Sequence, residues 1–313
     1  MLREVGEPVD VLIEKLNGER KKFSEIGLIP RDFLVSTADV RTYSSEIQGR
    51  PGKIDKGADY GPRSITVPFM FEAVDLYDYP LFRDEIYAWL GSIEAFWIYE
   101  GRSAGIYKFE SPGQYDDSKA YEVDSDIIYG KRYLVRRTSN LAPDQQGVWG
   151  LDSISFETVE LPFGETTATT LTPFVIGNGE DEVENSIWTV GQAKIFDEEP
   201  RYTFTNPTTI QVYNGGTERV DPDEGMHLVI EYKGVSTNLK LKNQTNGSEW
   251  SFLGNSVAND SIKIEGVHSA LNLLSIVRNT NLELIKLEPG WNTIQVTGAT
   301  SGTLSFDFRW YFR

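Results

Sequence analysis

The sequence has no cysteine and only two histidines among its 313 residues. Without thiols the chain forms no disulfide, no iron–sulfur cluster and no thiolate zinc site, and it offers no cysteine nucleophile. Two histidines are too few for a three-histidine metal centre. We therefore predict that the chain holds no cofactor and no metal.

Positive charge and long apolar runs are scarce as well. Lys and Arg number 30 against 47 Asp and Glu, which gives a formal net charge of −17. Tight contact with a phosphate backbone or an anionic membrane surface needs a basic stripe or patch, so we predict no specific nucleic-acid binding. No stretch approaches the roughly 18 apolar residues of a membrane-spanning helix, which predicts no membrane insertion. Residues 1–8 lack the apolar core of a signal peptide, so we expect synthesis in a cytoplasm.

Common catalytic motifs are missing too. There is no G-x-x-x-x-G-K-[ST] phosphate loop, no G-x-S-x-G elbow and no H-E-x-x-H zinc motif. His227 and His268 have no neighbouring nucleophile in the sequence, so no catalytic triad is indicated. Asp124 and Asp126 have the spacing of the first two ligands of a calcium-binding loop, but the later ligands of such a loop do not follow. A glycoside hydrolase would need two carboxylates about 5–10 Å apart across a cleft, and the sequence nominates no pair. We predict that the protein is not an enzyme.

A pattern of short β-strands fills most of the sequence. Segments that alternate with period two are separated by turns rich in Gly, Pro, Asn and Asp. Many short strands at this spacing indicate a mainly β protein whose second half is a sandwich or jelly roll. The strands predicted in that half cover residues 201–205, 209–213, 227–232, 238–242, 261–265, 292–296 and 303–308.

One helix interrupts this pattern at residues 81–90. Pro80 suits the first helical turn because its missing N–H would have no partner there, and Gly91 ends the apolar periodicity. The apolar residues fall on one stripe, which is typical of a helix that covers a sheet. We therefore predict an N-terminal β-sandwich-like domain with one covering helix.

Two polar stretches stand out in the first half. Ser44–Gly61 is rich in glycine and charge and predicts an exposed hairpin or loop. Gly101–Asp126 predicts a long loop or hairpin, and its role is not evident from the sequence. Pro68 interrupts a strand-like run, which argues for a sheet edge or a bulge at that point.

Composition also marks a domain boundary. The stretch after Phe163 is rich in threonine without a core-forming period, and an acidic run of turn residues follows it. We predict an N-terminal domain at residues 1–163, a linker at residues 164–185 and a C-terminal β-sandwich domain at residues 186–313.

Aromatic residues are abundant, with 7 Trp, 15 Tyr and 16 Phe. Trp188, Trp250 and Trp291 lie on or beside turns of the second half, where an exposed ring could stack on the apolar face of a sugar. They are therefore candidate carbohydrate contacts. The alternative is that these rings fill the sandwich core or an interface.

Two ordered sets of motifs carry a family resemblance. In the first half they are Tyr60–Phe71, Asp75–Ile86, Tyr129–Arg136 and Gly147–Phe156. In the second half they are Val212–Gly216, Tyr232–Gly234, Leu241–Thr245, Leu287–Val296 and Phe306–Phe312. In this order, the first half resembles the N-terminal domain of siphophage distal tail proteins and the second half resembles their galectin-like C-terminal domain.

The resemblance implies a structural role in a virion. Distal tail proteins form a hexameric ring at the distal end of the phage tail, with the N-terminal domains in the ring. Implied partners are other copies of the chain, the major tail tube protein, the tail-associated lysin or fibre protein, and receptor-binding proteins. The alternative function is a carbohydrate-binding module that attaches the tail tip to host cell-wall saccharide. The residues of the ring interface do not follow from the resemblance.

Overall fold

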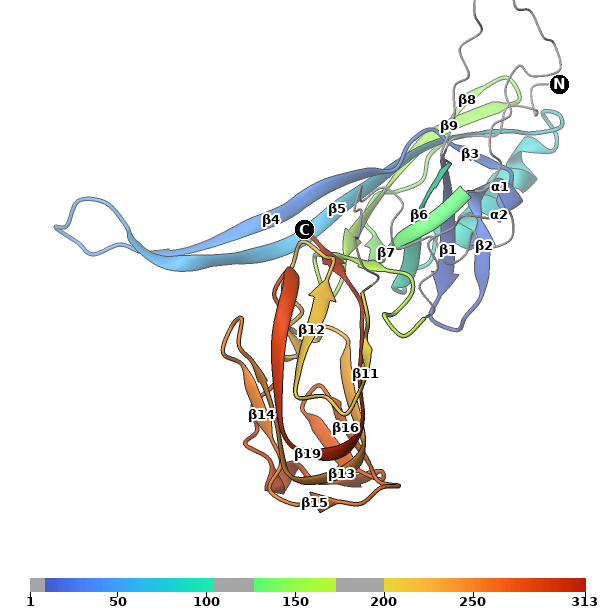
Figure 1. The fold of residues 1–313 in the computed structure, drawn as a ribbon. Coiled ribbons are helices and arrows are strands. Elements are labelled where there is room, and N and C mark those ends of the chain that lie inside the picture. Colours follow the sequence, from blue (N-terminus) through green and yellow to red (C-terminus); the bar gives the residue numbers. More distant parts are fainter. Residues whose placement is uncertain (1–8, 104–126, 173–199) are drawn as a thin grey trace, which may run out of the picture. The chain divides into compact units, whose positions relative to one another are not determined.

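The computed structural model describes residues 9–103, 127–172 and 200–313. These residues form two β-rich compact units, Met1–Gly164 and Glu165–Arg313, each considered by itself below (Figure 1). The prediction of a mainly β protein is confirmed. Most of the Gly101–Asp126 segment and residues 173–185 of the predicted linker lie outside the described residues.

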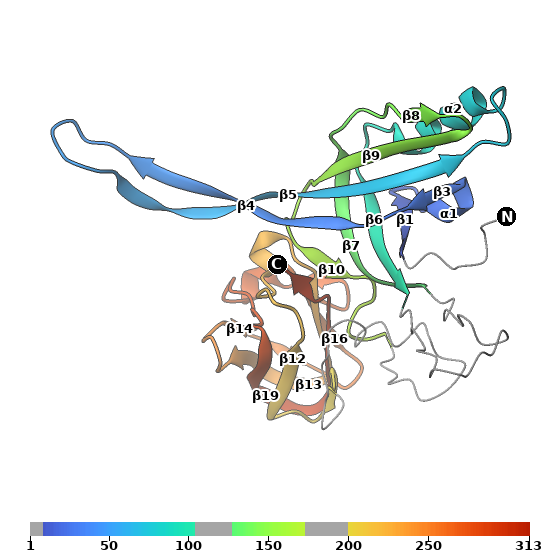
Figure 2. The same cartoon turned by 90° about the horizontal axis from the view of Figure 1, so that it is seen from above.

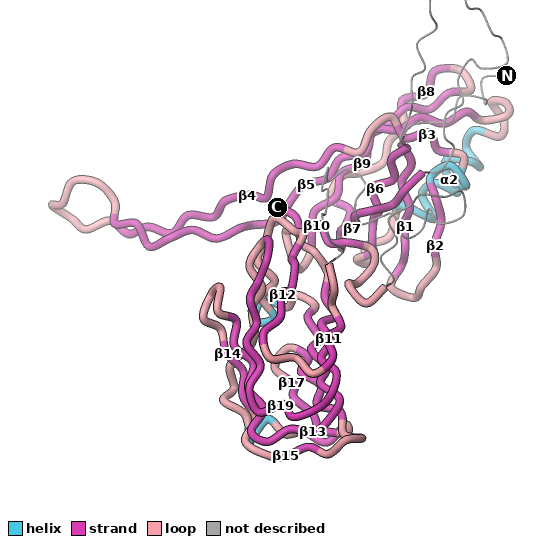
Figure 3. Tube along the Cα trace, viewed as in Figure 1, coloured by secondary structure: helices cyan, strands magenta, loops and turns pink. Residues whose placement is uncertain are grey.

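In its described residues, the first unit is an antiparallel sheet with two helices (Figure 3). Its main strand order is β2-β1-β6-β7-β9-β5-β3, while β4 pairs with β5 and β8 pairs with β9. The strands are β1 (Val9–Lys15), β2 (Arg20–Lys22), β3 (Leu28–Pro30), β4 (Leu34–Ser45), β5 (Ile54–Glu72), β6 (Phe96–Ser103), β7 (Ile127–Arg137), β8 (Asp144–Gln146) and β9 (Trp149–Thr158). The helices are α1 (Phe23–Ile26) and α2 (Tyr79–Leu90).

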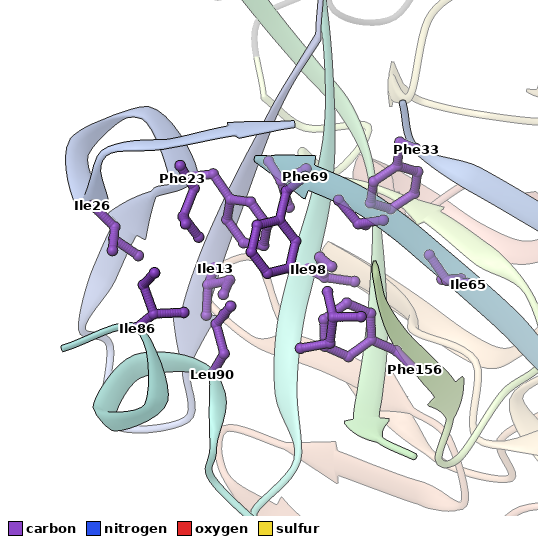
Figure 4. Close-up of a cluster of buried hydrophobic side chains, with 14 of the residues drawn as sticks. Ile13, Phe23, Ile26, Phe33, Ile65, Phe69, Ile86, Leu90, Ile98 and Phe156 are labelled. Atoms are coloured by element: carbon purple, nitrogen blue, oxygen red, sulfur yellow. The ribbon is translucent and has the colours of Figure 1, made fainter. Parts of the chain in front are cut away.

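Helix α2 confirms the helix predicted from the sequence. Pro80 lies in its first turn, and the Gly91 N–H donates to the Tyr87 carbonyl at 2.8 Å where the helix ends. Ile86 and Leu90 are fully buried against the sheet, and Figure 4 shows Leu90 beside Ile13 of β1. Burying side chains of this size contributes about 1.5–3 kcal/mol each. Helix α1 was not predicted, because one turn is too short to show a helical period.

Aromatic rings fill much of the core beneath this helix. Phe23 of α1 meets Phe69 of β5 edge to face, with ring centroids 6.2 Å apart (Figure 4). Phe96 and Phe156 form a second edge-to-face pair at 5.7 Å. Such pairs add about 0.5–1.5 kcal/mol to simple area burial. These two aromatic pairs pack α1, β5, β6 and β9 into one hydrophobic core.

Pro68 lies inside β5, where a proline would normally remove a ladder hydrogen bond. On one side of β5, strand β3 pairs as far as Phe69 and strand β4 begins at Thr66, so Pro68 faces the gap between them. Its carbonyl accepts from the Arg31 N–H at 2.8 Å on that side. Because N–H and C=O of one residue point to the same side of a strand, the missing donor faces the gap as well. The proline is therefore accommodated by a break between two neighbouring strands.

The second unit is built on two long antiparallel strands. The strand order is β11-β19-β13-β16-β17-β18, with β12 on β19 and with β14 and β15 on β13. The strands are β10 (Gly164–Thr166), β11 (Thr203–Thr205), β12 (Thr209–Asn214), β13 (Leu228–Asn243), β14 (Glu249–Ser251), β15 (Asn255–Ser256), β16 (Ser261–Glu265), β17 (His268–Leu271), β18 (Leu274–Ser275), β19 (Gly290–Phe308) and β20 (Tyr311–Phe312). The described residues of this unit also contain two short 3₁₀ turns, η2 (Pro222–Glu224) and η3 (Val277–Asn279).

Strands β13 and β19 each combine two predicted strands. They pair from Leu228 opposite Phe308 to Asn243 opposite Ile294, with register shifts near the middle. Gly298 lies at this point with a φ of +80°. Bulges of this kind let one strand bend without ending. The sequence has a glycine at this bulge. A glycine between two strand-like segments also indicates a turn, which is why two separate strands were predicted.

The first residues of the predicted linker belong to the second unit. The Thr166 N–H donates to the Trp310 carbonyl at 3.0 Å, and the Thr170 N–H donates to the Phe308 carbonyl at 3.0 Å. The predicted domain limits stay a prediction, with the division between the units falling directly after Gly164. In the part of the chain that the structure describes, no helix is long and apolar enough to cross a membrane.

Candidate functional site

Strands β4 and β5 continue beyond the sheet as a two-stranded ribbon (Figures 1 and 2). Strand β5 pairs with β9 only from Ser64 to Glu72, whereas its pairing with β4 continues to Ile54, opposite Ser45. We define the arm as residues 39–60. All of its side chains are exposed except Ser45 and Ile54, which are half-buried. The predicted exposed hairpin at Ser44–Gly61 therefore exists and is longer than the polar stretch alone indicated.

One face of the arm is small and apolar. Val40 lies opposite Tyr60, and Thr42 lies opposite Ala58. Since side chains alternate between the two faces of a strand, these four share one face. Val40 and Tyr60 are exposed there, and the Tyr60 ring contacts Phe163 edge to face at 5.8 Å between centroids. An exposed apolar ribbon face of this kind is suited to contact with another protein surface.

The other face of the arm is polar and internally hydrogen-bonded. Arg41 lies opposite Asp59 and donates from Nε to Asp59 Oδ1 at 3.1 Å. The Tyr43 hydroxyl donates to Asp59 Oδ2 at 2.9 Å. This bond to a carboxylate raises the pKa of Tyr43. The polar groups of this face thus have partners within the ribbon itself.

A second exposed apolar surface follows the end of β5. We define the β5–α2 patch as Val74, Leu76, Tyr77 and Leu81. Val74 is 90% exposed and Tyr77 is 92% exposed. Asp75 Oδ1 accepts from the N–H groups of Tyr77 and Asp78 at 2.7 and 2.8 Å, which shapes the loop without covering an apolar side chain.

The aromatic residues predicted as carbohydrate contacts fall in different environments. Trp250 is 1% exposed, and its Nε1 donates to Ser269 Oγ at 3.2 Å, so its ring is closed to a ligand in solution. Trp291 is 50% exposed and packs on Tyr213, with ring centroids 4.9 Å apart. Trp188 lies outside the described residues. Trp291 is thus the one of the three that the structure places at the surface.

Titratable groups do not assemble into a metal centre within the described ranges, where no cluster of three or more His, Asp or Glu has suitable geometry. His227 Nε2 lies 3.7 Å from Asp307 Oδ2. Burial works to raise the pKa of Asp307, but the hydrogen bonds it accepts outweigh burial, so its pKa is lowered. Asp124 and Asp126, the two residues with the spacing of a calcium loop, lie outside the described residues.

The sequence pointed to the hairpin but not to its faces. Cross-strand register decides which residues lie opposite each other, and bulges at three places in the β4–β5 pairing shift that register. The β5–α2 patch was also not predicted, because its apolar residues flank a helix start and no local period shows whether they are buried or exposed. An unusually apolar turn between Glu72 and Pro80 is the signal that could have revealed it.

Comparison with known proteins shows what this architecture is similar to. The family model of the phage tail protein RIFT-related domain matches residues 16–158, which include the arm and the β5–α2 patch. The first unit is therefore similar to phage tail domains of this kind.

The whole chain shares its fold with a solved phage protein. The crystal structure of SPP1 Dit (gp 19.1), described as a paradigm of the hub adsorption apparatus in phages that infect Gram-positive bacteria, matches with a TM-score of 0.58. The match covers 96% of this chain and 99% of that chain at 11% identity. With the family match, it confirms the resemblance to siphophage distal tail proteins. The galectin-like character of the second unit stays a prediction.

Two further comparisons add little. A chain in the structure of the activated phage p2 baseplate with Sr matches over 96% of this chain and 97% of its own length, at 8% identity. Its TM-score of 0.36 is too low to support an argument from the fold. No curated protein matches the chain.

Proposed function

We propose that this chain is the structural distal tail protein of a long-tailed phage, and that six copies form the ring at the tail tip. The ring joins the tail tube, built of the major tail tube protein, to the tail-associated lysin or fibre protein. It also docks receptor-binding proteins, and it has no catalytic activity. The phage tail domain at residues 16–158 and the fold shared with SPP1 Dit support a structural tail role.

The observation that carries the proposal is the arm. A two-stranded hairpin is marginally stable by itself in water. Here residues 39–60 expose both ribbon faces, including Val40 and Tyr43. A segment with so little burial within its own chain gains stability when a neighbouring subunit covers it, because the contact buries its apolar side chains. Closed rings need this kind of contact between two different surfaces of identical copies.

The oligomeric mass in solution tests the ring. We expect wild-type protein at high concentration to reach six times 35.3 kDa in light scattering. A variant in which residues 42–58 are replaced by Asn-Gly keeps the tight turn between Arg41 and Asp59 and should stay monomeric. Unchanged thermal unfolding would show that the shortened chain is folded. A wild-type protein that stays monomeric both alone and in purified tails would contradict the proposal.

A second candidate function rests on Trp291. Its half-exposed ring is supported from below by Tyr213, an arrangement that can stack on the apolar face of a sugar. We propose that, if the tail tip grips host cell-wall saccharide through the second unit, Trp291 makes the contact. On a glycan array, Trp291→Ala should abolish any binding seen for the wild type. Leu273→Ala, at a fully exposed position of the same unit, is the matched control. Binding that survives Trp291→Ala would contradict the role of this residue.

A further inference from the structure

The proposed ring leaves open which surfaces of adjacent copies touch. We propose that the apolar face of the arm of one copy packs onto the β5–α2 patch of the next copy. The inference rests on the proposed function and adds to it the two contacting surfaces. It concerns the first unit only.

The distribution of charge favours a second copy of this chain as the partner that covers the β5–α2 patch. The whole chain carries −17, so identical copies repel one another. The arm does not share this excess of negative charge, because its four basic residues, Arg41, Arg50, Lys53 and Lys56, equal its four acidic residues, Asp39, Glu46, Asp55 and Asp59. Residues 72–85, around the patch, hold five acidic residues and one arginine. Because the arm as a whole is neutral, charge repulsion does not oppose its approach to an acidic apolar patch.

The positions of the two surfaces exclude contact within one copy. The arm lies at the start of β5 and the patch follows directly after its last residue, Glu72 (Figure 2). From Tyr60, at the base of the arm, to Glu72 strand β5 advances by 12 residues (72 − 60), which corresponds to roughly 40 Å of extended chain. A strand held in a sheet cannot fold back to join its own ends. Two different surfaces that point away from each other are what a head-to-tail, ring-closing contact requires.

Side-chain size fits this pairing. Three of the four side chains on the apolar face of the arm, Val40, Thr42 and Ala58, are small, so the ribbon backbone can approach closely there. The fourth, Tyr60, packs against Phe163. The patch presents the long side chains of Leu76, Tyr77 and Leu81. Aromatic and large apolar side chains that enter a shallow complementary surface are the usual anchors of protein interfaces. The polar face of the arm has its own internal hydrogen bonds and stays towards solvent.

Disulfide trapping tests the contact directly, because the native chain has no cysteine to compete. Ala58→Cys and Leu76→Cys are made in separate copies, one of them carrying a mass tag, and the two are mixed under mild oxidation. We expect the mixed disulfide to form at least about tenfold faster than in the control pairs, since bound surfaces raise the effective thiol concentration.

Two control pairs make the result specific. Tyr43→Cys, on the opposite face of the arm, is mixed with Leu76→Cys. Ala58→Cys is also mixed with Leu273→Cys, whose leucine is 94% exposed in the second unit. Equal trapping in the control pairs would overturn the inference, since random collision would then account for the disulfide.

A mixing experiment tests the two surfaces as a donor and an acceptor. Val40→Asp should disable the arm, and Leu76→Asp should disable the patch, while both changes lie at exposed positions that do not support the core. Each variant alone should stay monomeric, and the mixture should stop at two copies because only one competent interface remains. If the wild type forms a ring of six but the Ala58→Cys and Leu76→Cys copies form no mixed disulfide, the inference is overturned and the proposed function is not. Absence of both the ring and the disulfide would overturn the proposed function as well.

Discussion

Tyr133 shows how a single buried group links the fold to pH. Its ring is buried in the core of the first unit, and the pKa of its hydroxyl is raised from 10 to about 12, with burial as the largest cause. The nearby Glu100 carboxylate contributes to this rise, while Arg63 acts in the opposite direction. The folded state therefore keeps Tyr133 neutral at a pH where the unfolded chain ionises it.

This shift predicts a loss of stability in alkaline solution. Below pH 10 the contribution is complete, and it is lost as pH rises from about 10 to about 12, amounting to about 3 kcal/mol for two pKa units. Tyr133→Phe should lose less stability than the wild type across that window in urea unfolding. Tyr77→Phe, at an exposed position, is the control and should keep the wild-type pH profile. Parallel profiles for all three proteins would contradict the prediction.

Gly298 is the residue that allows β19 to bend. A Cβ at this position would lie 2.4 Å from the Thr237 carbonyl oxygen, in addition to the cost of its left-handed φ. Gly247 has nearly the same φ, +79°, but open space around it. Gly247→Ala should therefore cost about 1–2 kcal/mol, the backbone penalty alone. Gly298→Ala should cost about 1–3 kcal/mol more because of overpacking. Urea unfolding of both variants measures the difference, and equal losses would show that the close approach is relieved.

At the scale of secondary-structure elements, a few buried side chains hold α2 against the sheet. Ile86 is fully buried, whereas Leu81 lies exposed on the same helix. Ile86→Ala should lower the free energy of unfolding by about 2–5 kcal/mol, from lost burial and the cavity left behind. Leu81→Ala should change it by no more than about 0.5 kcal/mol. Chemical denaturation of the two variants checks this contrast, which fails if Leu81→Ala proves as costly as Ile86→Ala.

Elements differ in how far the sequence predicts them. Helix α2 was predicted correctly because its proline, its glycine and its apolar stripe are local signals. The strands 227–232 and 238–242 were predicted as separate, whereas β13 runs through both. Local patterns do not distinguish a glycine that ends a strand from one that bends it, since only the partner strand decides. Pro68 is tolerated for a similar reason, because the gap it faces is formed by β3 and β4.

At the scale of the whole molecule, net charge should govern assembly. Copies that each carry −17 repel, and salt shortens the screening length from about 10 Å at 0.1 M to about 3 Å at 1 M. If the copies meet through an apolar arm face, added NaCl should lower the protein concentration at which the ring forms. Light scattering across a salt series measures this trend. Weaker assembly at high salt would indicate an interface held mainly by ion pairs instead.

The amino-acid sequence alone determined the β-rich class, the covering helix, the exposed hairpin and the lack of thiol chemistry, because composition and short-range periodicity encode these properties directly. The tertiary structure decided which side chains remain accessible. Trp250 and Trp291 have similar local sequence settings, yet one is buried beside Ser269 and the other is half exposed on Tyr213. The two faces of the arm and the β5–α2 patch likewise follow from register and packing. Burial depends on what distant segments bring alongside, and no local period records that.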